Sequence, residues 1–215
     1  MSSAFIFDMD GTLVDSFEAH FRAWEDMFRD KIGASVTRDE FRGLFGMSME
    51  EIFKDFLRHR GMEYEGDLTP LVEYKQRLFR ERHLPMTKVL PGAVVLLEGL
   101  EKAGVRAAVA SNTTRENIEA TLESAGLNSY FDAVVGLDDV ERGKPDPGMF
   151  LKAASLLDAE PGECIVVEDS VHGLKAAKSA GMTAYAVLTG CSSAEELREA
   201  GADKVFETLD RIALD

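Results

Sequence analysis

Hydrophobic residues near the N-terminus form one short, unbroken run, and the pattern then changes. Residues 4–7, Ala-Phe-Ile-Phe, predict a buried strand that ends where Asp8 begins a polar stretch. From about residue 16 to residue 86, apolar residues instead recur every three or four positions, as on one face of a helix. The stripes are Phe17, Phe21, Trp24 and Phe28; Ile52, Phe53, Phe56 and Leu57; and Leu68, Leu71, Val72, Lys75, Leu78 and Phe79. This segment therefore predicts a small helical bundle with no strand inside it.

Beyond residue 88, short apolar runs alternate with helical patterns. The strands that we predict cover 105–110, 132–136, 164–168 and 183–187, and the helices include one ending at Gly104 and others over 114–125, 147–157 and about 172–180. This alternation is typical of a parallel sheet with helices on both faces. The predicted fold class is therefore α/β, with a Rossmann-like parallel-sheet core (residues 1–15 and 88–215) and an inserted α-helical cap (residues 16–87). Val14-Asp15 marks the exit from the core, and Pro85 and Pro91-Gly92 mark the return.

Composition narrows the class of protein but does not identify a function. The chain has 215 residues with a formal net charge of −15, and no block of lysine or arginine stands out, so a nucleic-acid partner is not expected. Its apolar runs are far shorter than the roughly 20 residues of a membrane span. Cys164 and Cys191 are the two cysteines, in no metal-like or redox-like spacing. We expect a cytoplasmic protein without a membrane partner, monomeric or a weak homodimer.

Polar residues follow several of the predicted strands. In an open parallel sheet, ligands bind at the carboxyl ends of the strands, so these residues should meet at one rim. They are Asp8, Asp10 and Thr12; Ser111, Asn112 and Thr113; Lys144 in "RGKPDP"; and Glu168, Asp169 and Ser170. Carboxylates, hydroxyls and an ammonium group are therefore expected in one cleft.

The spacing of the acidic residues indicates a metal. Asp8 and Asp10 lie two positions apart, so their side chains leave an extended segment on the same side. With Asp169 they would repel one another without a cation, and Mg²⁺ prefers such oxygen ligands. An ionised aspartate can also act as a nucleophile without a base. Thr113-x-x-Glu116 further predicts a capping box at a helix N-terminus just after Ser111, a position that favours an anion.

Four segments carry a resemblance to a known family. "DMDGT", "SNT", "GKP" and "VEDSVHGLKAAKSAGM" resemble, in order, the four motifs of the haloacid dehalogenase superfamily. The motifs span residues 8 to 182, and the helical segment lies where capped members carry their insertion. Within the superfamily, the chain is most similar to the β-phosphoglucomutase and phosphoglycolate-phosphatase-like group.

The resemblance implies a role for each core residue. Asp8 would be the nucleophile and a metal ligand, and Asp10 the acid/base, binding the metal through its backbone carbonyl. Thr12 would orient Asp10. Ser111 and Lys144 would hold the phosphoryl group, Asp169 would ligate Mg²⁺, and Glu168 would act on the metal through a bound water.

Three further residues are candidates for substrate binding. Asn112 follows Ser111 in the second motif, and Lys75 is a possible cation of the cap. His20, in "FEAHFRAW", is either an interface histidine or a residue near the substrate, and the sequence leaves both interpretations open.

These residues favour a magnesium-dependent phosphatase that hydrolyses a small phosphorylated metabolite through an aspartyl phosphate. A sugar phosphate mutase similar to β-phosphoglucomutase is the alternative, and a noncatalytic phosphate-binding regulator is a third. The mutase carries a cap arginine where this chain has Met49, and a thioether cannot make the bidentate contact of a guanidinium with phosphate. The regulator is disfavoured because the nucleophile, acid/base, lysine and metal acid are all present. The cap is expected to hinge at Val14–Ser16 and Met86–Pro91.

Overall fold

A parallel sheet forms the centre of the larger part of the molecule. The computed structural model describes residues 4–214, and within them this sheet has six strands in the order β5-β4-β1-β6-β7-β8. The strands are β1 (Ala4–Phe7), β4 (Arg106–Ala110), β5 (Ala133–Val135), β6 (Cys164–Glu168), β7 (Thr183–Val187) and β8 (Lys204–Phe206). In the register, Phe7 of β1 lies level with Val109 of β4 and Val167 of β6. The residues that follow these strands therefore share one edge of the sheet.

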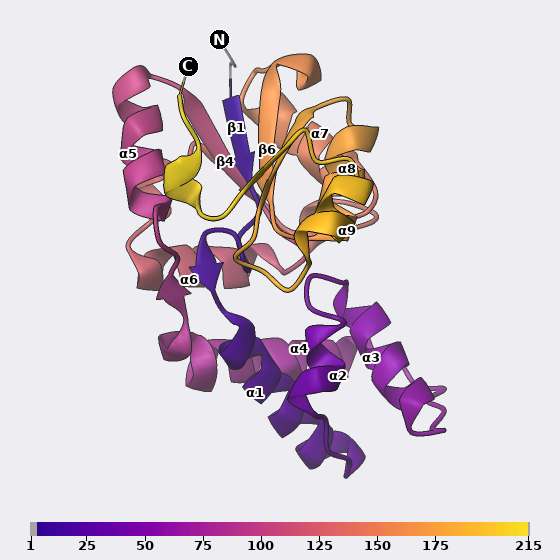
Figure 1. Ribbon diagram of the computed structural model, residues 1–215. Coiled ribbons are helices and arrows are strands. Elements are labelled where there is room, and N and C mark those ends of the chain that lie inside the picture. The colour runs from indigo at the N-terminus through magenta and orange to yellow at the C-terminus, as the bar shows by residue number, and fades with distance from the viewer. Residues whose placement is uncertain (1–3, 215) are drawn as a thin grey trace.

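Helices cover both faces of this sheet (Figure 1). They are α5 (Ala93–Ala103), α6 (Arg115–Ala125), α7 (Gly148–Leu156), α8 (Val171–Ser179) and α9 (Ala194–Glu199), with 3₁₀ turns over Asn128–Tyr130, Leu137–Asp139, Pro161–Glu163 and Leu209–Arg211. Alternate residues of β1 enter different cores, because successive strand side chains point to opposite faces. Ile6 packs in the core that contains α7, α8 and α9, and Phe7 in the core that contains α5 and α6. This arrangement confirms the predicted α/β fold class.

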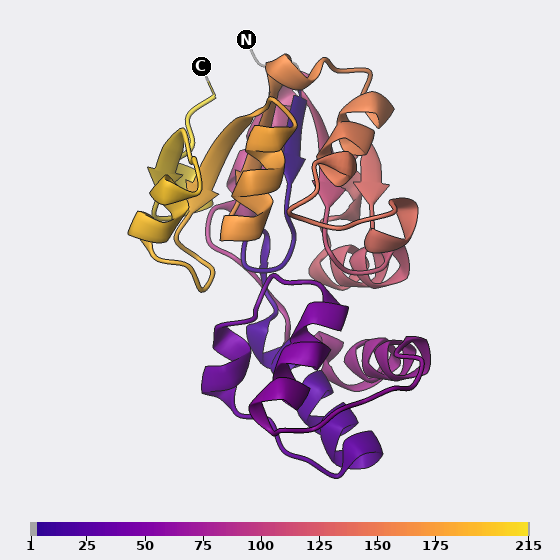
Figure 2. The ribbon, with the colours of Figure 1, turned by 90° about the vertical axis from the view of Figure 1, so that its right-hand side faces the viewer.

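A bundle of helices lies against one end of the sheet (Figure 2). It comprises α1 (Phe17–Met27), α2 (Arg38–Arg42), α3 (Met49–His59) and α4 (Thr69–Leu78), with π-helical turns over Phe28–Ile32 and Phe79–His83 and a 3₁₀ turn over Leu84–Met86. The predicted apolar stripes meet in a third, separate core, where the Trp24 ring lies 5.8 Å from that of Phe56. Capping boxes at Thr37 and Ser48 begin α2 and α3. We call residues 16–87 the cap and the rest the core, and these limits stay a prediction.

The two connections between cap and core pair with each other. β2 (Val14–Asp15) lies antiparallel to β3 (Lys88–Val89), with Val14 opposite Val89. A two-stranded ribbon, rather than two independent loops, therefore joins the parts.

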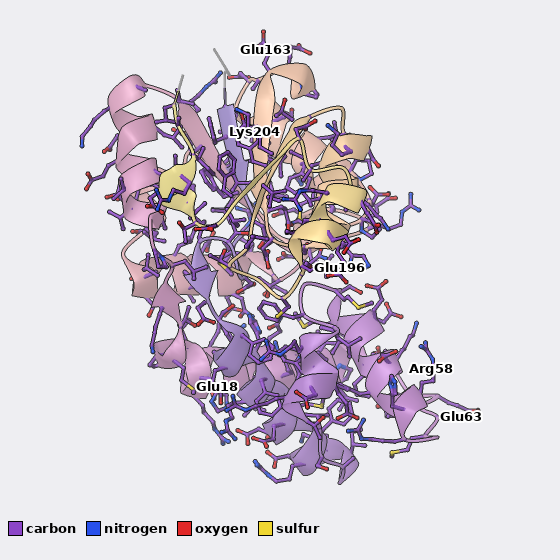
Figure 3. The ribbon with its side chains drawn as sticks, in the orientation of Figure 1. Glu18, Arg58, Glu63, Glu163, Glu196 and Lys204 are labelled. Carbon is purple, nitrogen blue, oxygen red and sulfur yellow. The ribbon has the colours of Figure 1, made fainter. Side chains whose placement is uncertain are left out.

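Two elements near the C-terminus were not predicted. β8 is a three-residue edge strand with an exposed Lys204, and α9 is a single short helix, so neither shows a sustained periodicity. Charged side chains, such as those of Arg58, Glu63, Glu163 and Glu196, lie on the outside of both parts (Figure 3). Among residues 4–214, no helix has both the length and the apolar character that crossing a membrane requires.

Candidate active site

Three buried carboxylates meet where β1 and β6 end. Asp8 follows β1, Glu168 is the last residue of β6, and Asp169 is next; each offers an oxygen within 4.8 Å of the others. The backbone N–H of Asp8 donates to the carbonyl of Val167 at 2.9 Å, which ties the two strand ends together. The Asp10 side chain lies outside this group, and its metal contact through the backbone carbonyl stays a prediction. We call Asp8, Glu168 and Asp169 the acid cluster.

The Asp169 carboxylate is held between a hydroxyl group and two glycines. Thr12 Oγ1 donates to Asp169 Oδ1 at 3.2 Å. A β-carbon on Gly11 or on Gly190 would overlap the carboxylate, so only glycine fits at either position. The expectation that Thr12 orients Asp10 is therefore corrected: its hydroxyl contacts Asp169. Gly190 was missed, because a lone glycine after a strand looks like any turn residue.

Lys144 joins two members of the acid cluster. Its Nζ lies 2.5 Å from Asp8 Oδ1 and 2.7 Å from Glu168 Oε1, and its side chain is almost fully buried. Burial opposes the charge on Lys144, but the two carboxylates outweigh it and raise the pKa of the ammonium group. The other oxygen of Glu168 accepts from the Ser170 hydroxyl and from the backbone N–H groups of Asp169 and Ser170, at 2.8–2.9 Å. Glu168 is thus fixed by its own loop.

The acid cluster carries more negative charge than Lys144 balances. Burial, with Glu168 and Asp10 adding to it, raises the pKa of Asp8 from its usual 3.8 to about 8 although Lys144 acts in the opposite direction. Burial and the neighbouring carboxylates also raise the pKa of Asp169 well above its ordinary value. A hard divalent cation would stabilise the ionised forms, and buried carboxylate oxygens within 4.8 Å of one another are the donors it requires. The residues present therefore fit such an ion.

The loop after β4 supplies Ser111, Asn112 and Thr113. Ser111 Oγ lies 3.5 Å from Asp10 Oδ2. Asn112 lines the cavity, but its side chain is engaged with backbone groups: Oδ1 accepts from Lys144 N at 2.9 Å, and Nδ2 donates to the carbonyl of Gly46 in the cap at 3.3 Å. The amide therefore holds the lysine loop and the cap loop, and its predicted contact with substrate stays a prediction.

The predicted capping box after Ser111 is wrong. The helix α6 begins at Arg115, and its N-cap residue Thr114 makes no side-chain hydrogen bond to the backbone. The Thr113 hydroxyl instead accepts from two amide side chains, and Glu116 pairs with Arg80 at 3.0 Å. Contacts with the cap have replaced the local bonds that the motif predicts.

Comparison with known proteins identifies the family. Residues 5–187 match the family model described as haloacid dehalogenase-like hydrolase. The chain belongs to this family. It is 35% identical over 215 residues to "Probable phosphatase IndB" of Dickeya dadantii, covering 99% of this chain and 92% of the relative. It is 34% identical over 192 residues to the beta-phosphoglucomutase of Bacillus subtilis, covering 87% and 84%. The crystal structure of CbbY from Rhodobacter sphaeroides in complex with phosphate superposes with a TM-score of 0.85 at 30% identity, covering 98% and 96%.

These comparisons confirm the resemblance drawn from the four motifs. They also support the prediction of a phosphoric monoester hydrolase, since relatives of this haloacid dehalogenase-like chain are named as phosphatases. The roles of the individual residues stay predictions that rest on the geometry.

On the cap side of this hydrolase's site, Ser16, His20 and Lys75 form a hydrogen-bonded group around Asp10. Ser16 Oγ donates to Asp10 Oδ1 at 2.5 Å, and His20 Nε2 lies 3.3 Å from the same oxygen. Lys75 Nζ lies 2.7 Å from His20 Nδ1. When Lys75 is charged, its ammonium group can only donate, so Nδ1 accepts and the Nε2–H of a neutral ring donates to Asp10. His20 is thus a buried histidine with both ring nitrogens bonded that also lies next to Asp10, so both interpretations stay open and its role stays a prediction.

Burial is the largest single influence on the pKa values of Lys75, His20 and Asp10. It lowers the pKa of Lys75 from 10.5 to about 7, and burial with the nearby Lys75 also lowers the pKa of His20. Burial acts to raise the pKa of Asp10, but the His20 ring and the Ser16 hydroxyl outweigh it, and the pKa is lowered. The His20 ring stacks on Phe79 with centroids 4.2 Å apart. Asp10 is therefore held as an ionised acceptor in this position of the cap.

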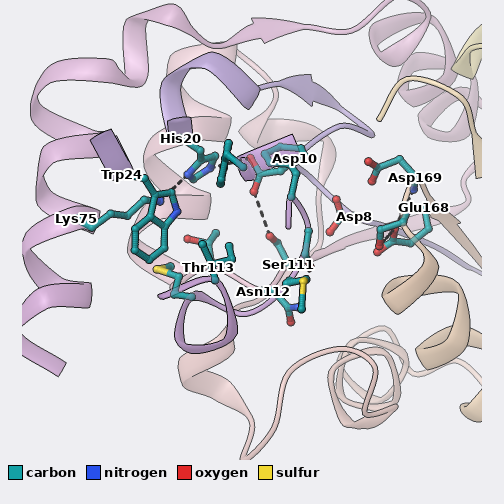
Figure 4. Close-up of a pocket in the computed structure, with 17 residues that line it drawn as sticks. Asp8, Asp10, His20, Trp24, Lys75, Ser111, Asn112, Thr113, Glu168 and Asp169 are labelled. Carbon is teal, nitrogen blue, oxygen red and sulfur yellow. Dashed lines mark hydrogen bonds and ion pairs between the residues drawn. The ribbon is translucent and has the colours of Figure 1, made fainter. Parts of the chain in front are cut away.

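A small cavity joins the two sets of polar groups. It measures about 50 Å³ and is closed on the cap side by apolar residues, among them Trp24, Phe45 and Met49. In Figure 4 the acid cluster lies at one end, Asp10 and Ser111 in the middle, and Trp24 and Lys75 at the other end. A wider cleft between cap and core, which Lys144 also lines, shares Met49 with this cavity.

Proposed function

We propose that this chain hydrolyses a small phosphate monoester with the help of Mg²⁺, through a covalent phosphoryl intermediate on Asp8. The observation that carries the proposal is the acid cluster itself: three buried carboxylates and Lys144 surround a position next to Asp10 and Ser111. Membership of a hydrolase family that includes relatives named as phosphatases supports it. The substrate is proposed to be a phosphorylated metabolite that enters between cap and core.

Asp8 and Asp169 would hold the ion, with Glu168 beside them. When bound, Mg²⁺ supplies positive charge that offsets the negative charge of carboxylates and phosphoryl oxygens. Lys144, paired with Asp8 and Glu168, adds a second positive charge on the same side. Ser111 would donate a hydrogen bond to another phosphoryl oxygen.

The proposed reaction has two steps. A carboxylate oxygen of Asp8 forms a bond to phosphorus while the bond from phosphorus to the ester oxygen breaks, and that oxygen takes a proton from Asp10. A water molecule then gives a proton to Asp10 and attacks phosphorus, which releases phosphate and the Asp8 carboxylate. Because the free site favours an ionised Asp10, this residue would take up a proton as the negatively charged phosphate binds beside it, and it returns to that protonated form at the end of the cycle.

The cap would open and close during this cycle. A cavity of about 50 Å³ is too small to admit a phosphorylated metabolite without movement. We propose that the cap hinges at Val14–Ser16 and Met86–Pro91, the segments that contain and flank the two-stranded ribbon. Closure would exclude water and strengthen the interactions among metal, Lys144 and phosphate.

A mutase remains the second candidate because a beta-phosphoglucomutase is among the relatives. Met49 argues against it: this residue lines the cavity at the start of α3 and offers no cation for a second phosphate. A noncatalytic regulator is disfavoured by the complete set of reacting residues.

A phosphate-release screen tests the proposal. The panel contains sugar phosphates, polyol phosphates, phosphoglycolate and nucleotides, each with Mg²⁺ and with a chelator. We expect release of phosphate from at least one monoester and loss of that activity with chelator. Conversion of a sugar 1-phosphate into its 6-phosphate without release of phosphate would favour the mutase. No turnover of any compound in the presence of Mg²⁺ would contradict both.

A further inference from the structure

A second buried polar network crosses the interface between cap and core. Gln76 lies on α4 of the cap, next to Lys75, and Asn117 lies on α6 of the core; both side chains are almost completely buried. Asn117 Nδ2 donates to Gln76 Oε1 and, at 3.2 Å, to Thr113 Oγ1. Gln76 Nε2 donates to the same Thr113 oxygen at 3.1 Å. Arg80, also on the cap, donates from Nη1 to Asn117 Oδ1 at 2.5 Å.

Arg80, at one end of this network, determines which group donates in each of its hydrogen bonds. A guanidinium group can only donate, so the Asn117 atom that faces Arg80 must be the carbonyl oxygen. The amide nitrogen of Asn117 then faces Gln76, which must present its own oxygen there. The Gln76 nitrogen is thereby turned toward Thr113. The path alternates between the parts, from Arg80 (cap) to Asn117 (core), Gln76 (cap) and Thr113 (core).

This direction fixes the role of the Thr113 hydroxyl. Its oxygen accepts from two amide groups, so both lone pairs are occupied and the remaining hydrogen must point elsewhere. No oxygen within residues 4–214 accepts a hydrogen bond from Thr113 Oγ1. Thr113 lines the active-site cavity, and Figure 4 places it on the side of Trp24 and Lys75, away from the acid cluster. The cavity is thus where the hydrogen can find an acceptor.

We propose that Arg80, Asn117 and Gln76 are positioning residues that hold the Thr113 hydroxyl as a hydrogen-bond donor toward the leaving group of the substrate. The proposal rests on the proposed phosphatase function. Because Thr113 lies at the end of the cavity away from Asp8, it meets the part of the substrate beyond the phosphoryl group. The leaving group that it selects carries an oxygen acceptor of its own, as sugars and polyols do, in addition to the ester oxygen.

The network also links this selection to the position of the cap. Two of its members move with the cap and two stay with the core, so opening the cap breaks the bonds from Gln76 and Arg80. Thr113 is then no longer an obligatory donor. A substrate with a matching acceptor therefore favours the closed cap, in which Asp10 and Lys75 are also in place.

A reversal of hydrogen-bond direction tests the proposal. Asn117→Asp keeps the shape of the side chain, and Arg80 keeps the new carboxylate ionised. The carboxylate offers only acceptors, so the Thr113 hydroxyl turns its hydrogen toward it, directly or through a reoriented Gln76 amide. We measure kcat/KM for two probes: the best substrate of the wild type among sugar and polyol monophosphates, and phenyl phosphate, which has no acceptor beyond its ester group.

We expect Asn117→Asp and Thr113→Val each to lower kcat/KM for the sugar or polyol phosphate about tenfold more than for phenyl phosphate. Any effect of the added negative charge falls on both probes and cancels in the ratio. Thr113→Ser keeps the ratio of the wild type. The double variant Thr113→Val/Asn117→Asp loses no more selectivity than Thr113→Val alone, because both changes remove the same bond.

Thr121→Val is the matched control. Thr121 lies one helical turn after Asn117 on α6, is fully buried, and its hydroxyl has no partner within residues 4–214, so this variant should leave both rates unchanged. Equal losses on both probes for Asn117→Asp, or a wild-type ratio for Thr113→Val, would overturn the proposal. So would a wild type that hydrolyses phenyl phosphate but no sugar or polyol phosphate. Failure of the wild type on every probe would instead contradict the proposed function.

Discussion

The two ends of the active-site cavity are built in different ways. At the core end, Asp8, Glu168 and Asp169 lie at the ends of neighbouring strands and are held by other core residues: Lys144 bonds Asp8 and Glu168, and Thr12 bonds Asp169. At the cap end, His20 and Lys75 reach the site from two helices and are held by each other. The core end is thus assembled within one part of the molecule, whereas the cap end depends on how the cap lies against the core. We expect changes at the core end to affect the chemical steps and changes at the cap end to affect selectivity and stability.

The largest effect is expected at Asp8. Asp8→Asn removes the charged nucleophile and one ligand of the acid cluster, so turnover should fall below detection. The fold should persist, because the amide retains the shape of the carboxylate and the raised pKa shows that the ionised form is costly there. Phosphate release and the thermal unfolding temperature are measured on the same preparation. Substantial phosphate release by a preparation free of wild-type enzyme would contradict the assignment.

A smaller but still large loss is expected for Asp10→Asn. The amide cannot move a proton in either step, so kcat should fall about 10²–10⁴-fold. Binding of Mg²⁺ should change little, because the Asp10 side chain lies outside the acid cluster. Steady-state kinetics and a Mg²⁺ titration separate the two effects. A kcat within a few-fold of the wild type would exclude Asp10 from proton transfer.

The acid cluster should make stability depend on both pH and metal. The pKa of Asp8 is raised from 3.8 to about 8, so between these values the metal-free folded protein holds a proton that the unfolded chain has lost. Its stability should therefore fall as the pH rises from about 4 to about 8. Mg²⁺ should offset this loss, so the increase in unfolding temperature on adding Mg²⁺ should grow with pH. The same increase at pH 5 and at pH 8, with ionic strength matched, would speak against a metal bound by Asp8.

At the cap end, Lys75 should produce a pH dependence of the opposite sign. Burial lowers its pKa from 10.5 to about 7, so between these values the unfolded chain holds a proton that the folded protein has lost. This group makes stability rise with pH over that window. Lys75→Met should remove the rise and stabilise the protein by roughly 2–4 kcal/mol at pH 6. It should also raise KM for the true substrate several-fold and change phenyl phosphate little.

Lys54→Met provides the control for that measurement. Lys54 is an exposed cap lysine that pairs with Glu50 on α3, so its removal should leave the pH dependence of unfolding as it is. The free energies of unfolding of wild type and Lys75→Met could differ by the same amount at every pH from 6 to 10. That result would show that the pKa of Lys75 is not lowered by burial as described here.

The same contrast explains what the sequence could predict. Strands β1, β6 and β7 match their predicted limits, because each contains a run of four apolar residues, at 4–7, 164–167 and 184–187. The residues of the acid cluster follow two of these strands, so their meeting could be predicted from strand ends alone. The ribbon of β2 and β3 could not, since two-residue strands show no period.

The contacts that were missed or wrongly assigned join residues far apart in the sequence. The Thr12 hydroxyl bonds Asp169, which lies 157 positions away in the chain, rather than the nearby Asp10. Thr113 accepts from Gln76 in the cap rather than capping its own helix. Neither partner can be found from local pattern, because packing between distant segments, and not the neighbouring sequence, decides where these hydroxyl groups bond.

The most direct test of the account is a search for the covalent intermediate. Asp10→Asn is incubated with Mg²⁺ and the best substrate from the screen, quenched in acid within one turnover, digested and analysed by mass spectrometry. An aryl phosphate with a good leaving group is run alongside, because its first step needs no proton from Asp10 and Asp10→Asn then slows chiefly the attack of water. With this substrate one phosphoryl group should accumulate on the peptide that contains Asp8, and none on the same peptide from Asp8→Asn/Asp10→Asn. A phosphoryl group on Ser111 or His20, or slow turnover with no modified peptide at any time, would contradict the proposal that Asp8 is the nucleophile.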